Sequence, residues 1–190
     1  MAQTRQPQLV LASASPRRAE ILQAVGWPFT IQPADLDETR LAHENAVEYV
    51  ERLAREKASA VAQRIASGLV LGADTVVVLE DEILGKPTDE ADARRMLSAL
   101  SGRWHEVVTG IALVQAGGAV QAVAHERTRV NFNALTTEEI AWYAATGEPL
   151  DKAGAYAVQG RAALFIKGLE GDYWNVMGLP VGLLYRLLKR

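Results

Sequence analysis

In the first part of the chain, short runs of apolar residues alternate with segments in which apolar residues recur at helical spacing. Ser15-Pro16 favours a helix start and Gly26 a helix end, while Gly68 closes a long helical period. The predicted elements are a strand at 8–13, a helix at 15–25, an extended segment at 27–31, a loop at 33–41 and a helix at 44–67.

The remaining sequence alternates strands and helices and contains one hairpin. The predicted elements are a strand at 69–79 interrupted by Gly72 and Asp74, a short strand leading into 85–87, a helix capped by Thr88 and running to Leu100, strands at 106–114 and 120–132 joined across 116–118, a helix from the Thr136 capping box to about Ala145, a loop-rich stretch at 147–160, a strand from 158 to 166, a turn at 168–172 and a helix from about Pro180. This order predicts an α/β fold, with one domain over 1–190 and a mixed, partly antiparallel sheet flanked by helices.

Composition removes several classes of protein. The 190 residues are 49% hydrophobic and include no cysteine, which excludes disulfides, a thiolate nucleophile and a cysteine zinc site. No run approaches the roughly 20 apolar residues of a membrane span. Net charge is −3 with scattered basic residues. We therefore expect a cytoplasmic protein with no membrane or nucleic-acid partner, although small anions could still bind to a few focused arginines.

The segment at 13–18 has the composition of a phosphate site. Ser13, Ser15, Arg17 and Arg18 place two hydroxyls and two guanidinium groups at a helix start, directly after a buried strand. Helix N-termini attract anions, and arginine adds forked hydrogen bonds. The alternative is that Ser15-Pro16 merely caps the helix while both arginines are solvated. Positive charge at a helix N-terminus is normally unfavourable, and a bound anion would resolve that conflict.

Two carboxylates are candidates for a metal or water contact. Asp74 lies inside an apolar strand, where an unpaired carboxylate would cost several kcal/mol or become neutral. The alternative for Asp74 is a hydrogen bond to neighbouring backbone. Glu38, in the polar loop before the long helix, could join Asp74 around a magnesium ion, although its position fits a surface residue equally well.

Two lysines and one glutamine are candidates for substrate contacts. Lys57 continues the apolar stripe of the long helix, so it should face inward, either to bind phosphate or to extend past small alanines to solvent. Lys86 is held extended before Pro87, which suits a substrate contact or a solvent-facing turn. Gln159 follows a glycine- and alanine-rich segment and carries an amide that could read a base edge. There is no Walker loop, GxSxG elbow or GxGxxG motif.

Six segments in order resemble the motifs of the Maf family of nucleoside-triphosphate pyrophosphatases. They are SASPRR at 13–18, YVERLAREKA at 49–58, LGADTVV at 71–77, LGKP at 84–87, LSG at 100–102 and EPLDKAGAYAVQG at 148–160. The resemblance implies a Maf/ITPase-like fold, a divalent metal (Mg²⁺ or Mn²⁺), a nucleoside triphosphate substrate and a homodimer. It also implies a role for each candidate: Asp74 as the catalytic carboxylate, Glu38 at metal or water, Ser13, Arg17, Lys57 and Lys86 at the triphosphate, and Arg18, Thr75 and Gln159 in substrate choice.

Within that family, the chain resembles the branch that acts on dTTP and UTP. Arg18, Thr75 and Gln159 carry this resemblance, whereas the branch acting on 7-methyl-GTP has a different residue beside the first arginine, a Ser-Asp-Gln type motif around the catalytic aspartate, and Glu in place of Gln159. An amide suits the mixed donor and acceptor edge of thymine or uracil. The alternatives are a 7-methyl-GTP pyrophosphatase and a nucleotide-binding regulator of cell division without turnover.

Overall fold

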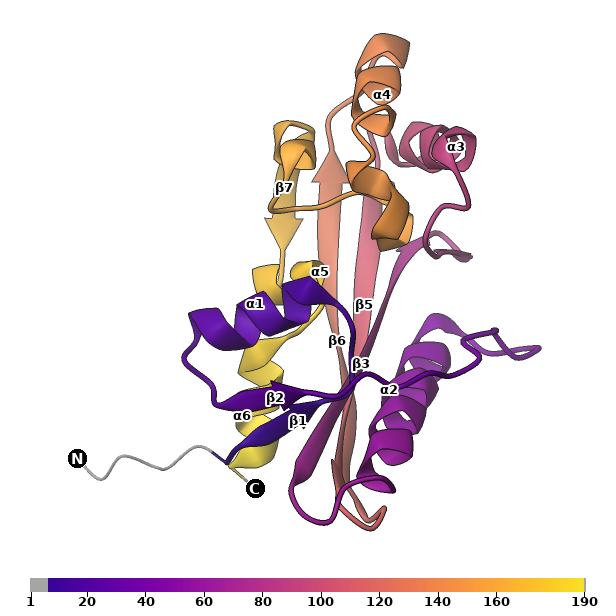
Figure 1. Ribbon diagram of the computed structural model, residues 1–190. Coiled ribbons are helices and arrows are strands. Elements are labelled where there is room, and N and C mark those ends of the chain that lie inside the picture. Colours follow the sequence, from indigo (N-terminus) through magenta and orange to yellow (C-terminus); the bar gives the residue numbers. More distant parts are fainter. Residues whose placement is uncertain (1–6, 190) are drawn as a thin grey trace. The chain divides into compact units, whose positions relative to one another are not determined.

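The computed structural model describes residues 7–189, which form a seven-stranded sheet and its flanking helices (Figure 1). The strands follow the order β2-β1-β3-β5-β6-β7, with β4 paired to β3. Strand β1 is parallel to β2 and β3, whereas β4 on β3 and β7 on β6 are antiparallel. The predicted α/β class with a mixed sheet is therefore confirmed.

The elements are β1 (Leu9–Leu11), α1 (Pro16–Ala24), β2 (Phe29–Ile31), α2 (Ala46–Ala62), β3 (Leu69–Leu79), β4 (Glu82–Leu84), α3 (Glu90–Leu100), β5 (Trp104–Gln115), β6 (Val120–Phe132), α4 (Thr137–Ala144), the 3₁₀ turns η1 (Glu148–Asp151), η2 (Ala153–Ala155) and η3 (Arg161–Leu164), β7 (Ile166–Glu170), α5 (Tyr173–Met177) and α6 (Val181–Leu188).

Residue contacts divide the chain into two compact units. The first contains the described residues up to Asp74, together with Thr109–Glu126 and the segment from Gly178 onward. The second contains Thr75–Val108 and Arg127–Met177. Strands β3, β5 and β6 each contribute residues to both units. The assignment of 1–190 to one domain stays a prediction.

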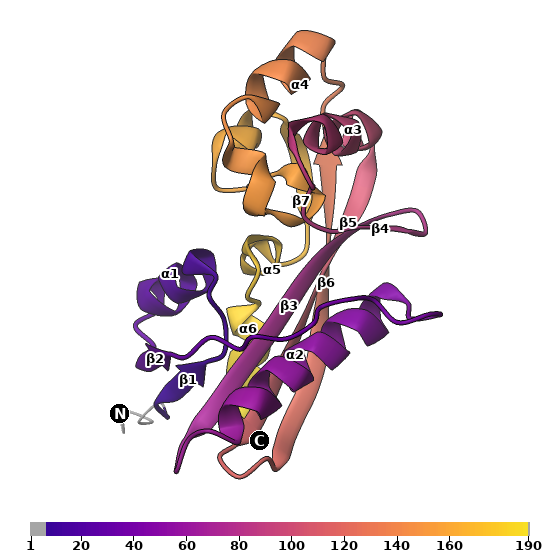
Figure 2. The same cartoon turned by 45° about the vertical axis from the view of Figure 1, so that its right-hand side comes forward.

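In the first unit, helix α2 lies directly against β3 and β5, as the ribbon of Figure 2 shows for β3. A Cβ added at Gly72 of β3 would come within 2.0 Å of the Ala54 carbonyl oxygen, and one added at Gly110 of β5 within 2.5 Å of the Val50 carbonyl. The side chain of Ala58 also packs at this contact. Two glycines therefore allow the backbone of α2 to approach the sheet closely.

In the second unit, α3 and α4 pack side by side over an apolar core rich in aromatic rings. His105, Phe132 and Tyr156 meet edge to face with ring centroids 4.9 to 5.3 Å apart. The turn η2 packs on β3, because Gly154 leaves no Cβ where the Val77 side chain lies. This packing fixes the segment around η2 within the second unit.

Proline and capping residues in the sequence correctly predicted where several helices begin. Helix α1 begins at Pro16 behind Ser15, and α4 has the predicted Thr136 and Glu139 capping box. Helix α6 begins directly after Pro180. Helix α3 is capped by Asp89 rather than by Thr88. None of the helices within residues 7–189 combines the length and apolarity needed to cross a membrane.

The end of α2 and the segment after residue 158 differ from the prediction. Helix α2 ends at Ala62 rather than near Ser67, because the Ala62 carbonyl accepts a hydrogen bond from the Gly117 amide at 3.1 Å. Strand β3 has the predicted bounds, and its hydrogen-bonded backbone is continuous through Gly72 and Asp74. The turn η3 occupies most of the predicted strand at 158–166, and β7 extends to Glu170 into the predicted turn at 168–172.

The difference at 158–172 has a long-range cause. Ile166 to Glu170 pair with Phe132 to Arg129 of β6, so the partner strand decides which residues are extended. Helix α5 follows because its buried Asn175 side chain donates to the Val107 carbonyl and to Thr128 Oγ1, both at 3.0 Å. Neither contact leaves a periodic signal in the local sequence.

Candidate active site in the first unit

The connection between β1 and α1 places Ser13 at the start of the helix. Ser13 is buried, and its Oγ accepts hydrogen bonds from the Ser15 amide at 3.2 Å and from Arg18 Nη1 at 3.0 Å. Ser15 occupies the N-cap position but its side chain makes no capping hydrogen bond, and the first turn has no acidic residue. The simple capping interpretation therefore does not account for this segment, and the unfavourable placement of two arginines at a helix N-terminus remains.

Arg18 is buried rather than solvated, which excludes the solvated alternative for this residue. Its Nε donates to the Gly178 carbonyl at 2.8 Å, so the side chain ties α1 to the segment before α6. Burial lowers the pKa of the Arg18 guanidinium, while the negative charge of Asp74 acts in the opposite direction. Arg17, the next residue toward the helix start, is half-buried. A fixed guanidinium group within the electrostatic reach of Asp74 suits the recognition of an anion.

The centre of the site is an ion-paired cluster on Lys57. Its Nζ lies 2.7 Å from Asp74 Oδ1 and 2.7 Å from Glu38 Oε1. The side chains of Lys57 and Asp74 are 8% and 11% exposed, against 48% for Glu38. Helix α2 contacts β3 where the backbone of Ala54 lies against Gly72. Lys57 is one turn after Ala54, and Asp74 is two residues after Gly72, so this contact brings the two side chains together. The prediction that Lys57 faces inward is confirmed, and its partner is a buried carboxylate.

The cluster explains how a charged Asp74 can remain in an apolar strand. Sequence reasoning favoured a metal or water contact for Asp74, and the structure places a lysine ammonium there. A buried carboxylate that lacks its partner typically costs about 3–5 kcal/mol, so the pair matters for stability as well as for chemistry. Glu38 comes from the loop between β2 and α2, which brings the second carboxylate to the same ammonium group.

The donor set around Lys57 also fits a divalent cation completed by substrate. The contacting oxygens of Asp74 and Glu38 each lie 2.7 Å from one nitrogen, so they are separated by no more than twice that distance. No group of three His, Asp or Glu side chains suited to a metal exists among residues 7–189. Mg²⁺ commonly uses one or two carboxylates together with water and substrate phosphates rather than an all-protein cage. Asp74 and Glu38 are therefore the residues that could hold such an ion.

The other predicted residues belong to the second unit. Thr75 follows Asp74 on β3 and is half-buried, whereas Lys86 and Gln159 are exposed. Two of the sequence motifs meet there, because the Gly154 amide donates to the Gly85 carbonyl at 3.0 Å. The roles of Thr75, Lys86 and Gln159 in substrate binding stay predictions.

The turn that carries Gln159 is held by Glu148. The Glu148 Oε1 accepts hydrogen bonds from Tyr143 Oη at 2.8 Å and from the Arg161 amide at 3.0 Å. A Cβ on Gly160 would come within 2.3 Å of this carboxylate, so a side chain at that position would have to displace it. The backbone on either side of Gln159 is therefore well defined even though its side chain is exposed.

Sequence reasoning missed the residues that hold the Glu38 loop. Glu44, Arg52 and Glu56 form an ion-paired group beside this loop. With Glu48, they recur at four-residue steps before and along α2, a pattern typical of a salt-bridged helix face. That spacing was the available signal, but it does not reveal that Arg52 also contacts the loop.

Comparisons with known proteins identify the family of this chain and a solved structure with a similar fold. A family model described as Maf-like protein matches residues 8–190. A protein named dTTP/UTP pyrophosphatase from Moorella thermoacetica is 57% identical over 173 residues, covering 91% of this chain and 89% of the relative. One of the same name from Symbiobacterium thermophilum is 54% identical over 174 residues, covering 92% and 89%. The solved structure of the Staphylococcus aureus Ham1 protein resembles this fold with a TM-score of 0.53 at 16% identity, covering 96% of this chain and 98% of that one.

Proposed function

Since this chain belongs to the Maf-like protein family, we propose that it is a nucleoside-triphosphate pyrophosphatase that hydrolyses dTTP and UTP. Water attacks the α-phosphorus, the bond to the bridging oxygen of the β-phosphate breaks, and the products are the nucleoside monophosphate and pyrophosphate. The observation that carries the proposal is the contact of the buried Lys57 with Asp74 and with the more exposed Glu38, because the family resemblance gives these three positions triphosphate, catalytic and metal or water roles. The names of the two relatives support the choice of substrate.

Asp74 and Glu38 would hold a divalent cation, Mg²⁺ or Mn²⁺, with oxygens of the substrate. When bound, such a cation polarises phosphate oxygens and offsets the charge that develops on the departing pyrophosphate. Asp74 has two candidate roles, as a ligand of this cation and as the base that accepts the proton of the attacking water. The metal affinity of Asp74→Asn separates them, since a base that does not bind the cation would leave that affinity unchanged.

The cations of the first unit would receive the triphosphate. The Lys57 Nζ lies within hydrogen-bonding distance of both carboxylates and so orients them. The hydrogen bonds of Arg18 to Ser13 and to the Gly178 carbonyl fix its guanidinium group before any substrate arrives. Groups fixed in this way stabilise developing charge without reorganising during the reaction. Arg17 at the helix start and Lys86 in the second unit would add further phosphate contacts.

Substrate choice would rest on Thr75, Arg18 and Gln159. The Gln159 amide offers both a donor and an acceptor, which matches the mixed edge of thymine and uracil. The hydrogen bonds of Glu148 hold the turn that carries Gln159. A carboxylate at this position would instead accept from a guanine edge, so the amide favours pyrimidine substrates.

The test is pyrophosphate release by the purified protein, with Mg²⁺ or Mn²⁺, across dTTP, UTP, CTP, the purine triphosphates and 7-methyl-GTP. We expect dTTP and UTP to give the largest kcat/KM. A preference for 7-methyl-GTP would overturn the interpretation of Thr75 and Gln159. Tight nucleotide binding without pyrophosphate release would overturn the enzymatic proposal and favour a nucleotide-binding regulator.

A further inference from the structure

Glu38 lies on an exposed loop, yet its carboxylate is paired with a buried lysine. Residues 37–41 are exposed and have no regular secondary structure. Exposed loops of this kind are generally mobile and would not by themselves hold a carboxylate at a fixed point. The Glu38 Oε1 nevertheless lies 2.7 Å from Lys57 Nζ. Other contacts must therefore restrain the loop.

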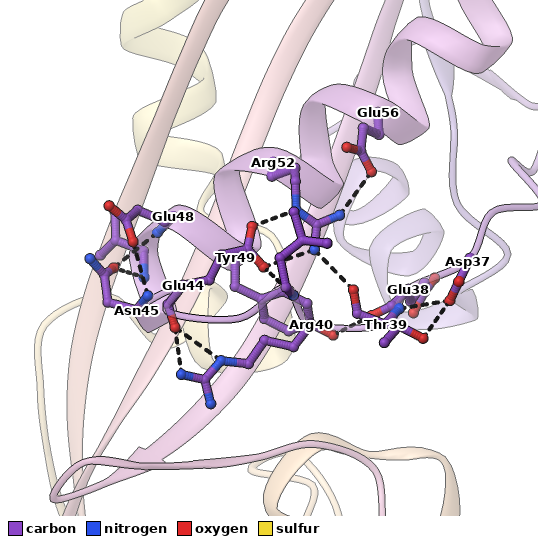
Figure 3. A network of polar contacts seen from close by, with 12 residues as sticks. Asp37, Glu38, Thr39, Arg40, Glu44, Asn45, Glu48, Tyr49, Arg52 and Glu56 are labelled. Atoms are coloured by element: carbon purple, nitrogen blue, oxygen red, sulfur yellow. Dashed lines mark hydrogen bonds and ion pairs between the residues drawn. The ribbon is translucent and has the colours of Figure 1, made fainter.

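Two donors on α2 hold consecutive carbonyl groups of this loop, as Figure 3 shows. Tyr49 Oη donates to the Glu38 carbonyl at 2.7 Å, and Arg52 Nη2 donates to the Thr39 carbonyl at 3.1 Å. Tyr49 and Arg52 are three residues apart, so they occupy one face of the helix. The two peptide groups on either side of Thr39 are thus tied to the same helix that carries Lys57.

Arg52 is itself held by a network of charges. Its Nε and Nη2 form a fork on the two carboxylate oxygens of Glu44, at 2.5 and 2.9 Å, and Nη1 donates to Glu56 at 3.0 Å. The side chains of Arg52 and Glu44 are each 12% exposed. Glu44 also accepts from the Leu41 amide at 2.9 Å, which restrains the second half of the loop. Forked, charge-assisted bonds in such a sheltered setting are geometrically specific.

We infer that Tyr49 and Arg52 are positioning residues that hold the loop 37–44 so that Glu38 stays beside Lys57 and Asp74. They act through Glu38 and do not touch the reacting atoms. This inference rests on the proposed function, because it assigns the loop a part in the same site. A displacement of about 1 Å at a catalytic group can lower turnover by roughly 10²-fold, so a restraint of this kind affects rate.

The test is a double-mutant cycle on pyrophosphate release that combines Arg52→Lys or Tyr49→Phe with Glu38→Gln. Arg52→Lys keeps the charge but removes the fork, and Tyr49→Phe removes one hydroxyl group. We expect each single variant to lower kcat, Arg52→Lys by about tenfold. Neither should lower kcat further in the Glu38→Gln background, because the loop then has no carboxylate to position. Arg55→Lys, at an exposed site on the same helix, is the control and should keep the wild-type kcat.

Equal effects of Arg52→Lys in both backgrounds would overturn the inference, and so would a wild-type kcat in both Arg52→Lys and Tyr49→Phe. A second measurement, amide hydrogen exchange without substrate or metal, is independent of activity. The Leu41 amide, bonded to Glu44, should exchange about tenfold faster in Arg52→Lys than in wild type or Arg55→Lys. Unchanged exchange also contradicts the restraint. If wild type releases no pyrophosphate, the proposed function fails, whereas the exchange experiment still tests the restraint.

Discussion

At the scale of single residues, the pair formed by Lys57 and Asp74 serves stability and chemistry together. Asp74 lies between Ala73 and Thr75 in a strand whose other side chains are mainly apolar, and Lys57 offsets its charge. Removing either partner leaves an uncompensated charge in a poorly hydrated place. Asp74→Asn keeps a side-chain oxygen that can accept the hydrogen bond of Lys57, whereas Asp74→Ala removes it, so Asp74→Asn is the gentler substitution for the fold.

Asp74→Asn should reduce pyrophosphate release from dTTP by about 10²-fold or more, because the amide has the shape of the carboxylate but lacks its charge and basicity. Steady-state kinetics measures the effect, and circular dichroism checks that the fold is kept. Asp81→Asn, at an exposed turn on the same hairpin, is the matched control and should retain activity. Near-normal turnover in Asp74→Asn would contradict both candidate roles of this residue, as a ligand of the cation and as the base.

His105 gives the second unit a pH-dependent stability. It is 3% exposed, its Nε2 lies 2.8 Å from Tyr156 Oη, and burial lowers its pKa to about 4 from an ordinary value of 6.5. The unfolded chain therefore binds this proton below pH 6.5, whereas the folded protein does not bind it until the pH approaches 4. The unfolding free energy contributed by His105 is constant above pH 6.5 and falls as the pH drops toward 4.

Replacement of His105 by Gln should remove this dependence while keeping a polar group near Tyr156. Between pH 7 and pH 4 the wild type should lose roughly 3 kcal/mol more unfolding free energy than His105→Gln, at about 1.4 kcal/mol per pH unit. Urea unfolding at a series of pH values measures this difference. His43→Asn is the control, since His43 is exposed and its positive φ of 71° is tolerated by asparagine. Parallel pH profiles for wild type and His105→Gln would contradict the assignment.

At the scale of elements, the position of α2 decides whether Lys57 can reach Asp74. The helix rests on Gly72 and Gly110 through the backbone of Ala54 and Val50. Because the contact is between main chains, a single added methyl group has no flexible side chain to displace. The geometry of the site therefore depends on two residues that carry no functional group.

Gly72→Ala should destabilise the protein by about 3 kcal/mol and lower turnover, because the added Cβ would lie 2.0 Å from the Ala54 carbonyl and force α2 away from β3. Urea unfolding and pyrophosphate release measure the two effects. Gly182→Ala is the matched control: it lies in α6, where the nearest atom to a new Cβ is the Arg186 side chain at 3.7 Å. It should leave stability unchanged or raise it by about 0.5–1 kcal/mol. Equal stability of Gly72→Ala and wild type would contradict the close packing of α2.

Elements encoded by local chemistry were predictable from the sequence, and elements that depend on distant partners were not. Pro16 and the capping box at Thr136 fix helix starts through neighbouring atoms, and the stripe containing Lys57 fixes which face of α2 is buried. The end of α2 depends on the Gly117 amide, and β7 depends on its pairing with β6. These contacts join segments far apart in sequence, so no local pattern reports them.

The same distinction applies to the candidate site. The charged residues could be identified from their unusual settings, such as Asp74 in an apolar strand and Lys57 on an apolar stripe. Their pairing, and the attachment of the Glu38 loop by Tyr49 and Arg52, could not. A hydrogen bond from a helix to a loop carbonyl is independent of the identity of the loop residue, and it leaves no trace in residue types.

At the scale of the whole molecule, the net charge is −3, so a nucleoside triphosphate is repelled at long range. Local positive charge must overcome this repulsion. In the first unit, Arg18 is buried close to Asp74, and Lys57 lies between two carboxylates. The two carboxylates more than offset the single positive charge of the lysine. A highly charged anion that binds here therefore needs a further cation, which is the physical reason to expect metal dependence.

Chelation of divalent ions should abolish pyrophosphate release, and added Mg²⁺ or Mn²⁺ should restore it. Glu38→Gln should raise the metal concentration for half-maximal activity by about tenfold, since one charged ligand is lost. Asp81→Asn should keep the wild-type requirement, because Asp81 is exposed and lies outside the cluster on Lys57. Full activity in the presence of chelator would contradict metal dependence. An unchanged metal concentration for half-maximal activity in Glu38→Gln would show that Glu38 is not a ligand of the metal. The second result would leave the contact of Glu38 with Lys57 as its whole role, because an ion pair alone orients the ammonium without binding a cation.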